Sequence, residues 1–204
     1  MTVGLLRSTR RFFLMLAFMA LAAPGIAQQG ALTVPRNLDQ LTDRSAVIVR
    51  GTVLSARVEK HPEFTGLDTV VVKLRVQETL KGQSKDTFTF RQYIWDIRDR
   101  SDAAGYRKGQ DMLLLMIAPS EYGLSSPAGM EQGRFRIMRD STGKEFAVNG
   151  TANFRLFDGI STQLAKEGVS LSSRSESLVT RPQRGPVEAS ALTGLIRELA
   201  QRKP

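Results

Sequence analysis

The sequence predicts a mainly β protein: a small antiparallel β-barrel of five to six strands, with a short helix before it and an amphipathic helix after it. Three observations predict this class. Short runs of β-branched and apolar residues recur between polar turns, apolar and polar residues alternate along one of these runs, and helical periodicity is confined to the two ends. Because the first runs are joined by short links, we expect a meander of sequential strands.

The first 27 residues have the three-part pattern of a secretory signal peptide. Arg7, Arg10 and Arg11 precede an apolar run over residues 12–23, and small residues lead to an expected cleavage after Ala27. The run is shorter than the ~20 apolar residues that cross a membrane, so we expect no membrane span after cleavage.

The arginine pair of this segment also resembles a twin-arginine export signal, although Met15 stands where a lysine is usual. General secretion is the favoured route because the apolar run is strongly hydrophobic. Both routes lead to the same expected location, periplasmic or secreted.

Composition restricts the chemistry open to the chain. Its 204 residues contain no cysteine and one histidine, His61, and removal of the signal lowers the formal net charge from +9 to +6. Disulfides, a cysteine-linked lipid anchor, a cysteine nucleophile and thiolate metal sites are therefore excluded, and a Ser-His-Asp triad would have to use His61. Neither a cofactor nor a resident metal is expected, because the usual phosphate-loop, nucleophile-elbow, zinc and dinucleotide motifs are lacking.

The first predicted elements form a helix and three strands. Asn37 is positioned to cap a short helix that presents Leu38 and Leu41. A strand over 46–58 follows, with Gly51 marking a bend or bulge. Alternation predicts a half-buried strand over 68–78, with Val70, Val72, Leu74 and Val76 on one face, and a third strand is expected over 86–93.

The second half of the predicted barrel is less regular. Residues 94–109 are polar, and the apolar run 111–118 predicts a buried central strand. A connection over 119–133 leads to a hairpin of strands 134–138 and 145–148, turning at 140–143.

We divide the chain into four parts: a signal peptide (1–27), a barrel domain (28–160), a flexible linker rich in Ser and Arg (161–185), and a carboxy-terminal amphipathic helix (186–204). Hydrophobic residues thin out in the linker, which we expect to be disordered. In the final helix, Leu192, Leu195, Ile196 and Leu199 lie on one face; Gly194 weakens it, so it must dock to persist.

A polar cluster follows the third strand. Asp96, Asp99 and Asp102 could form a cation site, but their spacing differs from a calcium loop and the arginines between them favour local ion pairing instead. Tyr93 and Trp95 could offer a stacking platform for a sugar or a base, or could cover one end of the barrel.

Basic residues on the predicted strands form the second candidate site. If they share a face they make a groove for a polyanion; otherwise they are the solvated side of an antiparallel sheet. The basic positions are Arg50, Arg57, Lys73, Arg75, Arg91, Arg134 and Arg136, and the candidate ligand-binding set is Arg50, Arg75, Arg91, Tyr93, Trp95, Arg134 and Arg136.

The connection over 119–133 is a third candidate, because its glycines and proline indicate a specific backbone course. It forms either a wide crossover or a binding loop. Asn149–Thr151 matches a glycosylation sequon, which matters only in a eukaryotic source.

The order of these elements resembles a known group of proteins. Residues 37–150 resemble uncharacterised exported bacterial proteins that look like OB-fold barrels, related in shape to the netrin-like domains and the tissue inhibitors of metalloproteinases. The resemblance lies in strand and turn signatures at 45–53, 76–82, 106–115 and 133–137. It implies an OB-like barrel and no catalytic residue. Inhibitors of that shape chelate zinc through an amino-terminal cysteine, and this chain has none.

These observations predict an exported, non-enzymatic binding module. The first expectation is a protein partner bound by the 119–133 connection and the terminal helix; the alternative is an anionic glycan bound by the basic strand face with Tyr93 and Trp95. No nucleic acid partner is expected. A third possibility, of another class, is a metal-dependent hydrolase that uses Asp96, Asp99 and Asp102.

Overall fold

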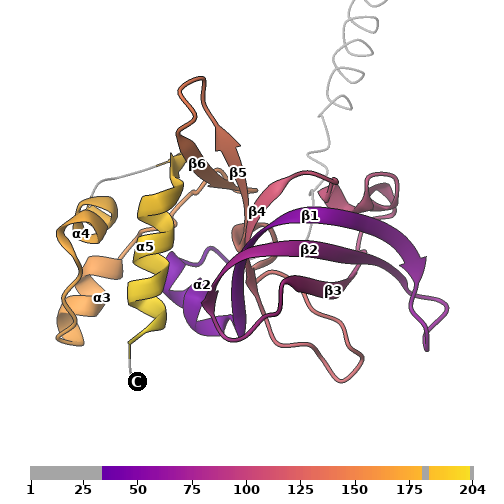
Figure 1. Cartoon of the computed structure of the whole chain (residues 1–204). Helices are drawn as coiled ribbons and strands as arrows, with labels where there is room; N and C mark the ends of the chain where they lie inside the picture. Colours follow the sequence, from indigo (N-terminus) through magenta and orange to yellow (C-terminus); the bar gives the residue numbers. More distant parts are fainter. Residues whose placement is uncertain (1–33, 181–183, 203–204) are drawn as a thin grey trace, which may run out of the picture. The chain divides into compact units, whose positions relative to one another are not determined.

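The computed structural model describes residues 34–180 and 184–202. The expected signal peptide, residues 1–27, lies outside the described residues. Figure 1 shows a mainly β architecture in which one antiparallel sheet is accompanied by helices. The predicted fold class is thereby confirmed at the level of a mainly β protein.

The sheet has seven strands in the order β3-β2-β1-β4-β5-β6-β7. Their bounds are β1 Val47–Lys60, β2 Asp68–Lys81, β3 Thr87–Tyr93, β4 Asp111–Met116, β5 Arg134–Arg139, β6 Glu145–Asn149 and β7 Val187–Glu188. Because β3 and β7 are both edge strands, the sheet is open, and the expected closed barrel of five to six strands is not what the sheet forms. The physical reason is that β5 continues the sheet to β6 and β7, and helices cover this second half.

Four helices accompany the sheet in the described residues: α2 (Leu38–Arg44), α3 (Ile160–Lys166), α4 (Ser173–Thr180) and α5 (Ala189–Ala200). Three short 3₁₀ turns, η1 (Ile97–Arg100), η2 (Ala103–Gly105) and η3 (Met130–Gln132), lie in the connections. The Asn37 cap is confirmed, because its side chain accepts the Gln40 amide while the Gln40 side chain accepts the Asn37 amide.

Strand β1 carries the predicted irregularity at Gly51. Its pairing with β2 shifts register between Arg50 and Gly51, which confirms the bulge. A Cβ at Gly51 would lie 2.4 Å from the Arg75 carbonyl oxygen, so no side chain fits at this crossing. The alternation predicted for β2 is also confirmed, since Val70, Val72 and Leu74 are fully buried.

Two apolar cores lie on the two faces of the sheet. The strand-side core is enclosed by β1–β4 and includes Val49, Val72, Phe90, Leu114 and Met116. The helix-side core lies between the other face and the four helices. Strand β4 contributes to both, and its pairing with β1 and β5 confirms the predicted buried central strand.

Residues 161–185 require a correction. The expectation of a linker without packed structure is wrong for residues 161–180, where α3 and α4 bury Leu164, Leu178 and Val179 in the helix-side core. Figure 1 shows these two helices beside α5. The terminal helix α5 does dock as expected, with Leu192, Leu195, Ile196 and Leu199 buried against the sheet.

The connection between β4 and β5 lies beside both β4 and the outer edge of β3. Isolated bridges join Pro127 to Met116 of β4 and Leu124 to Arg91 of β3. The first part of this connection, residues 117–128, therefore partly spans the space between the end of β4 and the edge of β3.

Candidate functional site

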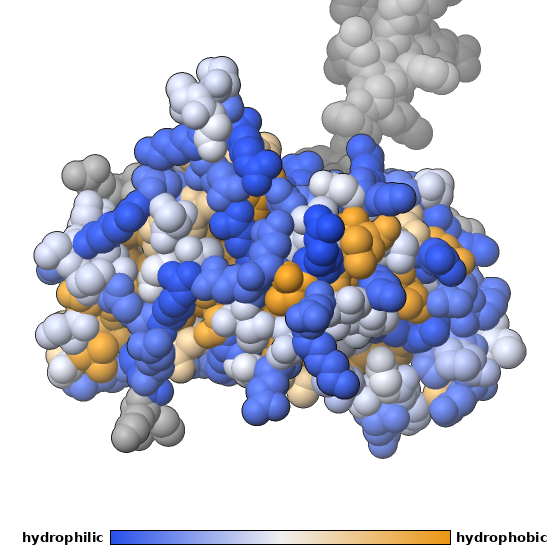
Figure 2. Space-filling view, in the orientation of Figure 1, coloured by the Kyte–Doolittle hydropathy of each residue, from blue (hydrophilic) through white to orange (hydrophobic). Residues whose placement is uncertain are grey.

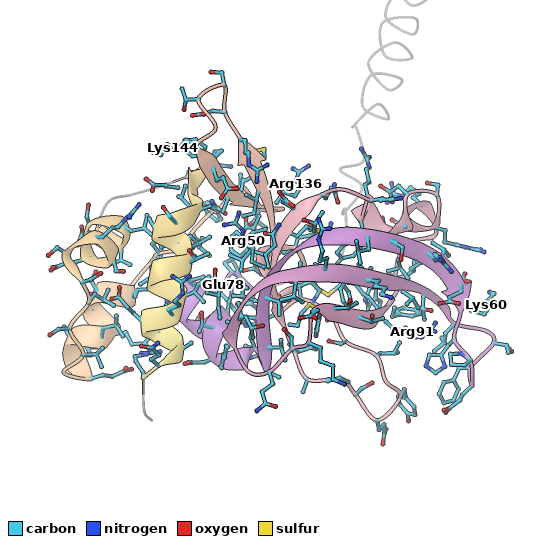
Figure 3. The ribbon with its side chains drawn as sticks, viewed as in Figure 1. Arg50, Lys60, Glu78, Arg91, Arg136 and Lys144 are labelled. Atoms are coloured by element: carbon cyan, nitrogen blue, oxygen red, sulfur yellow. The ribbon has the colours of Figure 1, made fainter. Side chains whose placement is uncertain are left out.

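The predicted basic residues do not share one face. Figure 3 shows Arg91 near the β1–β2 hairpin end of the sheet, Arg50 in its middle and Arg136 on β5. Arg134 pairs with Leu114 and Arg136 pairs with Met112, so both arginines lie on the strand-side face. Arg50 pairs with Leu113 and lies on the helix-side face. A groove built from all seven basic positions therefore does not form.

A smaller group of basic residues does share one face. Arg57, Lys73, Arg75 and Arg91 lie on β1–β3, on the face of the sheet opposite Val70, Val72 and Leu74. Helix α5 contacts β2 further along the strand, at Glu78. The cross-strand rows are Arg57–Val71–Arg91, Ser55–Lys73–Thr89 and Thr52–Arg75–Thr87. We call these four residues the basic face.

Most of the charge on the basic face is available to a ligand. Arg57, Lys73 and Arg75 are exposed, and none forms an ion pair or a side-chain hydrogen bond with another described residue. Arg91 is half-buried: its Nη1 donates to Thr69 Oγ1 at 2.7 Å, and its Nη2 lies 3.5 Å from Glu59. Three solvated cations and one oriented guanidinium thus lie in successive rows.

Two aromatic residues continue from the end of β3. The Tyr93 and Trp95 rings meet edge to face, with centroids 4.9 Å apart. Trp95 is 74% exposed, so most of its indole is open to solvent. Tyr93 is paired with Thr69, one row beyond the Arg57–Val71–Arg91 row, so the aromatic pair borders the basic face.

Arg50 is committed to an internal contact. Its Nη2 donates to Glu145 Oε2 at 2.6 Å, and its side chain is largely buried on the helix-side face. Arg50 is therefore not part of the basic face.

Arg134 is likewise held inside the fold. It stacks on the Tyr106 ring, with Cζ 4.7 Å from the centroid, pairs with Glu131 at 2.6 Å and donates to the Ala104 carbonyl. Burial lowers the pKa of Arg134, but Tyr106 and Glu131 outweigh this effect and the pKa is raised overall. Burial raises the pKa of Tyr106 to about 12, so its hydroxyl is neutral and donates to Gln92.

The three aspartates make local contacts. Arg98 Nε donates to Asp96 Oδ2 at 2.9 Å, and the hydrogen bonds from Arg98 lower the pKa of Asp96 to about 2. Asp102 accepts the Gly105 amide at the start of η2. Burial raises the pKa of Asp99, and the neighbouring carboxylates add to this. Among the residues that the structure describes, no group of three or more His, Asp or Glu side chains is arranged to hold a metal ion.

The single histidine holds a loop in place. His61 is buried, and its Nδ1 accepts the Glu63 and Phe64 amides at 3.2 Å, which places the ring proton on Nε2. Nε2 then donates to the Tyr122 carbonyl at 2.9 Å. His61 therefore ties the β1–β2 hairpin to residues 117–128, a role that the sequence did not indicate.

Of the two surfaces expected to bind a protein, one is internal and the other is partly buried. The apolar face of α5 is buried in the helix-side core, and within 119–133 the side chains of Ser125, Ala128 and Gln132 are buried. Figure 2 shows that the visible surface is mostly hydrophilic, with hydrophobic residues in small separate patches. The exposed residues of the connection are those of its first turn, at 119–123, and Glu131.

Fold and surface together define the class: a mainly β protein with an open seven-stranded antiparallel sheet, four helices in the described residues, and a basic outer face on β1–β3. No known family, curated protein or solved structure matches the chain. None of the helices that the structure describes is both long enough and apolar enough to cross a membrane.

Proposed function

We propose that this protein is an exported, non-enzymatic binding module whose ligand is an anionic glycan. The observation that carries the proposal is the basic face, where Arg57, Lys73 and Arg75 have no partner among the described residues and Arg91 is fixed beside them. Sulfate or carboxylate groups spaced along a glycan would pair with these cations.

The aromatic pair supports a sugar rather than a simple anion. A sugar ring stacks its apolar face on an indole, and the exposed Trp95 borders the basic face while Tyr93 fixes its orientation. The ligand would then lie along β1–β3, with anionic groups over Lys73 and Arg75 and one sugar ring on Trp95.

We also propose that the β1–β4 half of the sheet has an OB-like course, in keeping with the resemblance to exported barrel proteins. The support is the pairing sequence β3-β2-β1-β4 together with the two bridges by which residues 117–128 contact β4 and β3. OB-like barrels commonly bind oligosaccharides on the outer side of these strands.

Heparin, a sulfated glycan, provides the test. We expect wild-type protein to bind heparin with an affinity that falls steeply with salt, and to show a blue-shifted emission of Trp95, the only tryptophan. The double variant Lys73→Ala/Arg75→Ala should bind about tenfold more weakly, since each exposed charge contributes up to about 1 kcal/mol.

A matched control separates a site from net charge. Lys108→Ala/Arg136→Ala removes two exposed cations outside the basic face and should bind heparin like the wild type. Equal loss of affinity in both double variants, or equal binding of neutral dextran, would show that there is no glycan site on this face.

A further inference from the structure

A pocket lies beside the outer edge of β3, where the described residues add no further strand to the sheet. It has a volume of about 370 Å³ and lies between the outer edge of β3, the start of β1 and the end of β4. Its lining is mainly apolar, with Phe88, Phe90 and Met116 among it, and Thr89 and Arg91 also line it. This volume is in the range of small ligand sites.

The pocket adjoins unpaired backbone of β3. The Ile94 amide donates to Asp68 of β2, whereas the Arg91 carbonyl accepts from Ser125 on the other side. Because backbone groups alternate in direction along an antiparallel strand, the N–H and C=O of Thr87 and Thr89 point away from β2. Among the described residues, Leu124 alone pairs with this edge, opposite Arg91, so the edge at 87–90 is open.

We infer that this edge and pocket form a second binding site, which takes an extended peptide of a partner protein as an added strand beside β3. About four residues would lie opposite the open edge, at roughly 3.3 Å per residue. Main-chain hydrogen bonds to Thr87 and Thr89 would hold the peptide, and its alternate side chains would enter the pocket.

The two faces of β3 specify the chemistry of that peptide. Side chains opposite Phe88 and Phe90 would enter the apolar pocket, whereas a side chain opposite Thr89 would lie on the other face, diagonal to Arg91 and one strand away from Lys73. The expected ligand therefore alternates apolar and acidic residues. A second copy of the chain is a poor occupant, because pairing two β3 edges would bring two basic faces together.

The walls of the site are held independently of any ligand. The His61–Tyr122 hydrogen bond and the Ser125–Arg91 backbone bond fix residues 117–128 against the β1–β2 hairpin and β3. A preformed site lowers the ordering cost of binding a short peptide.

The probe is a seven-residue peptide, blocked at both ends, in which valine and glutamate alternate; the control peptide groups the same residues in two blocks. We expect the full chain to bind the alternating peptide at concentrations below about 1 mM, and the exchange of the Thr89 amide to slow in its presence. No binding, equal binding of the block peptide, or unchanged exchange at Thr89 would overturn the inference.

Variants of the edge make the test specific. Thr89→Pro removes the outward N–H and is tolerated at an edge strand, so it should weaken peptide binding about tenfold, whereas Thr89→Ala should bind like the wild type. Should Thr89→Pro fail to fold by circular dichroism, Ala46→Phe fills the pocket from its exposed rim and should abolish binding.

The same variants separate this site from the glycan proposal. Thr89→Pro should leave heparin affinity unchanged. Lys73→Ala/Arg75→Ala keeps Arg91 and the open edge of β3, so the peptide should still protect the Thr89 amide, even if it binds more weakly. Peptide binding that survives both Thr89→Pro and Ala46→Phe but disappears at high salt would reflect charge alone and would refute strand addition.

Discussion

At the scale of the residue, Arg134 shows how a basic side chain on a strand serves the fold. Its guanidinium lies over Tyr106, pairs with Glu131 and reaches the carbonyl of Ala104, whose backbone has a positive φ of 55°. The left-handed conformation of Ala104 is unfavourable for a residue with a Cβ, and Arg134 holds the turn that requires it.

We expect Arg134→Met to lower the free energy of unfolding by about 2–3 kcal/mol, because it removes a cation–π contact and leaves the carbonyl of the buried Ala104 without this donor. Urea denaturation would measure this loss, with Arg136→Ala, an exposed neighbour on β5, expected to stay within about 0.5 kcal/mol of the wild type. An Arg134→Met protein of wild-type stability that no longer bound heparin would instead identify Arg134 as a ligand residue.

At the scale of the element, Glu145 connects strands that are not neighbours. Its Oε2 accepts Arg50 of β1 at 2.6 Å, and its Oε1 accepts Arg139 Nη2 of β5 at 2.8 Å. The hydrogen bond from Arg50 and the further contacts of Arg139 lower the pKa of Glu145 below its ordinary value of 4.5.

Because the pKa of Glu145 is lowered in the folded protein, the free energy of unfolding depends on pH. Glu145 stabilises the fold above pH 4.5, and this contribution disappears as the pH falls through its lower folded-state pKa. We expect Glu145→Gln to be less stable than the wild type at pH 7, with the difference shrinking below pH 4.5. Chemical denaturation across pH would measure it, with Glu121→Gln as an exposed control; a difference that is constant with pH would contradict the expectation.

The strands could be predicted because sequence patterns a few residues long determine where they form. Alternation of apolar residues in β2, the glycine in β1 and the turn after β5 each specify backbone geometry within a few residues. The open sheet was not predictable in the same way, since whether β5 pairs onward to β6 and β7 depends on helices far along the chain.

Helix α4 shows why the Ser- and Arg-rich segment was misinterpreted. It buries only two apolar side chains, Leu178 and Val179, so its sequence has no clear helical periodicity. Its remaining contacts are polar and distant: the Ser175 hydroxyl donates to Glu198 of α5, and Arg174 pairs with Glu188. Such partners cannot be recognised before the fold brings them together. The basic face was only partly predictable. Its residues could be recognised on the predicted strands, but which of them share a face depends on the strand register.

At the scale of the whole molecule, an ion-pair cluster ties the beginning of the fold to its end. Arg202 pairs with Asp39 and Asp43 of α2 and with Glu167, the residue that ends α3. Asp39 is completely buried, and burial raises its pKa above the ordinary 3.8, although Arg202 opposes the shift. Because this pKa is raised, ionisation of Asp39 opposes folding, and its cost grows as the pH rises above 3.8.

We expect Arg202→Ala to lower the free energy of unfolding by about 3 kcal/mol at pH 7, because it leaves a buried carboxylate without its cation. The loss should be smaller near pH 4, where Asp39 takes up a proton more readily, and Asp39→Asn should restore part of the stability in the Arg202→Ala background. Thermal unfolding of the two single variants and the double variant would measure the coupling, and additive effects would show that the pair does not act as a unit.

The pairing of Arg202 with Asp39 joins residues 163 positions apart, and the helix-side core that surrounds it needs α5 to cover the sheet. A ribosome makes α2 early and α5 late. The growing chain therefore carries Leu38, Leu41 and the helix-side residues of β1 and β4 without their covering layer through most of its synthesis. This half therefore cannot complete its core until α5 has left the ribosome, and its apolar residues stay open to chaperones until then.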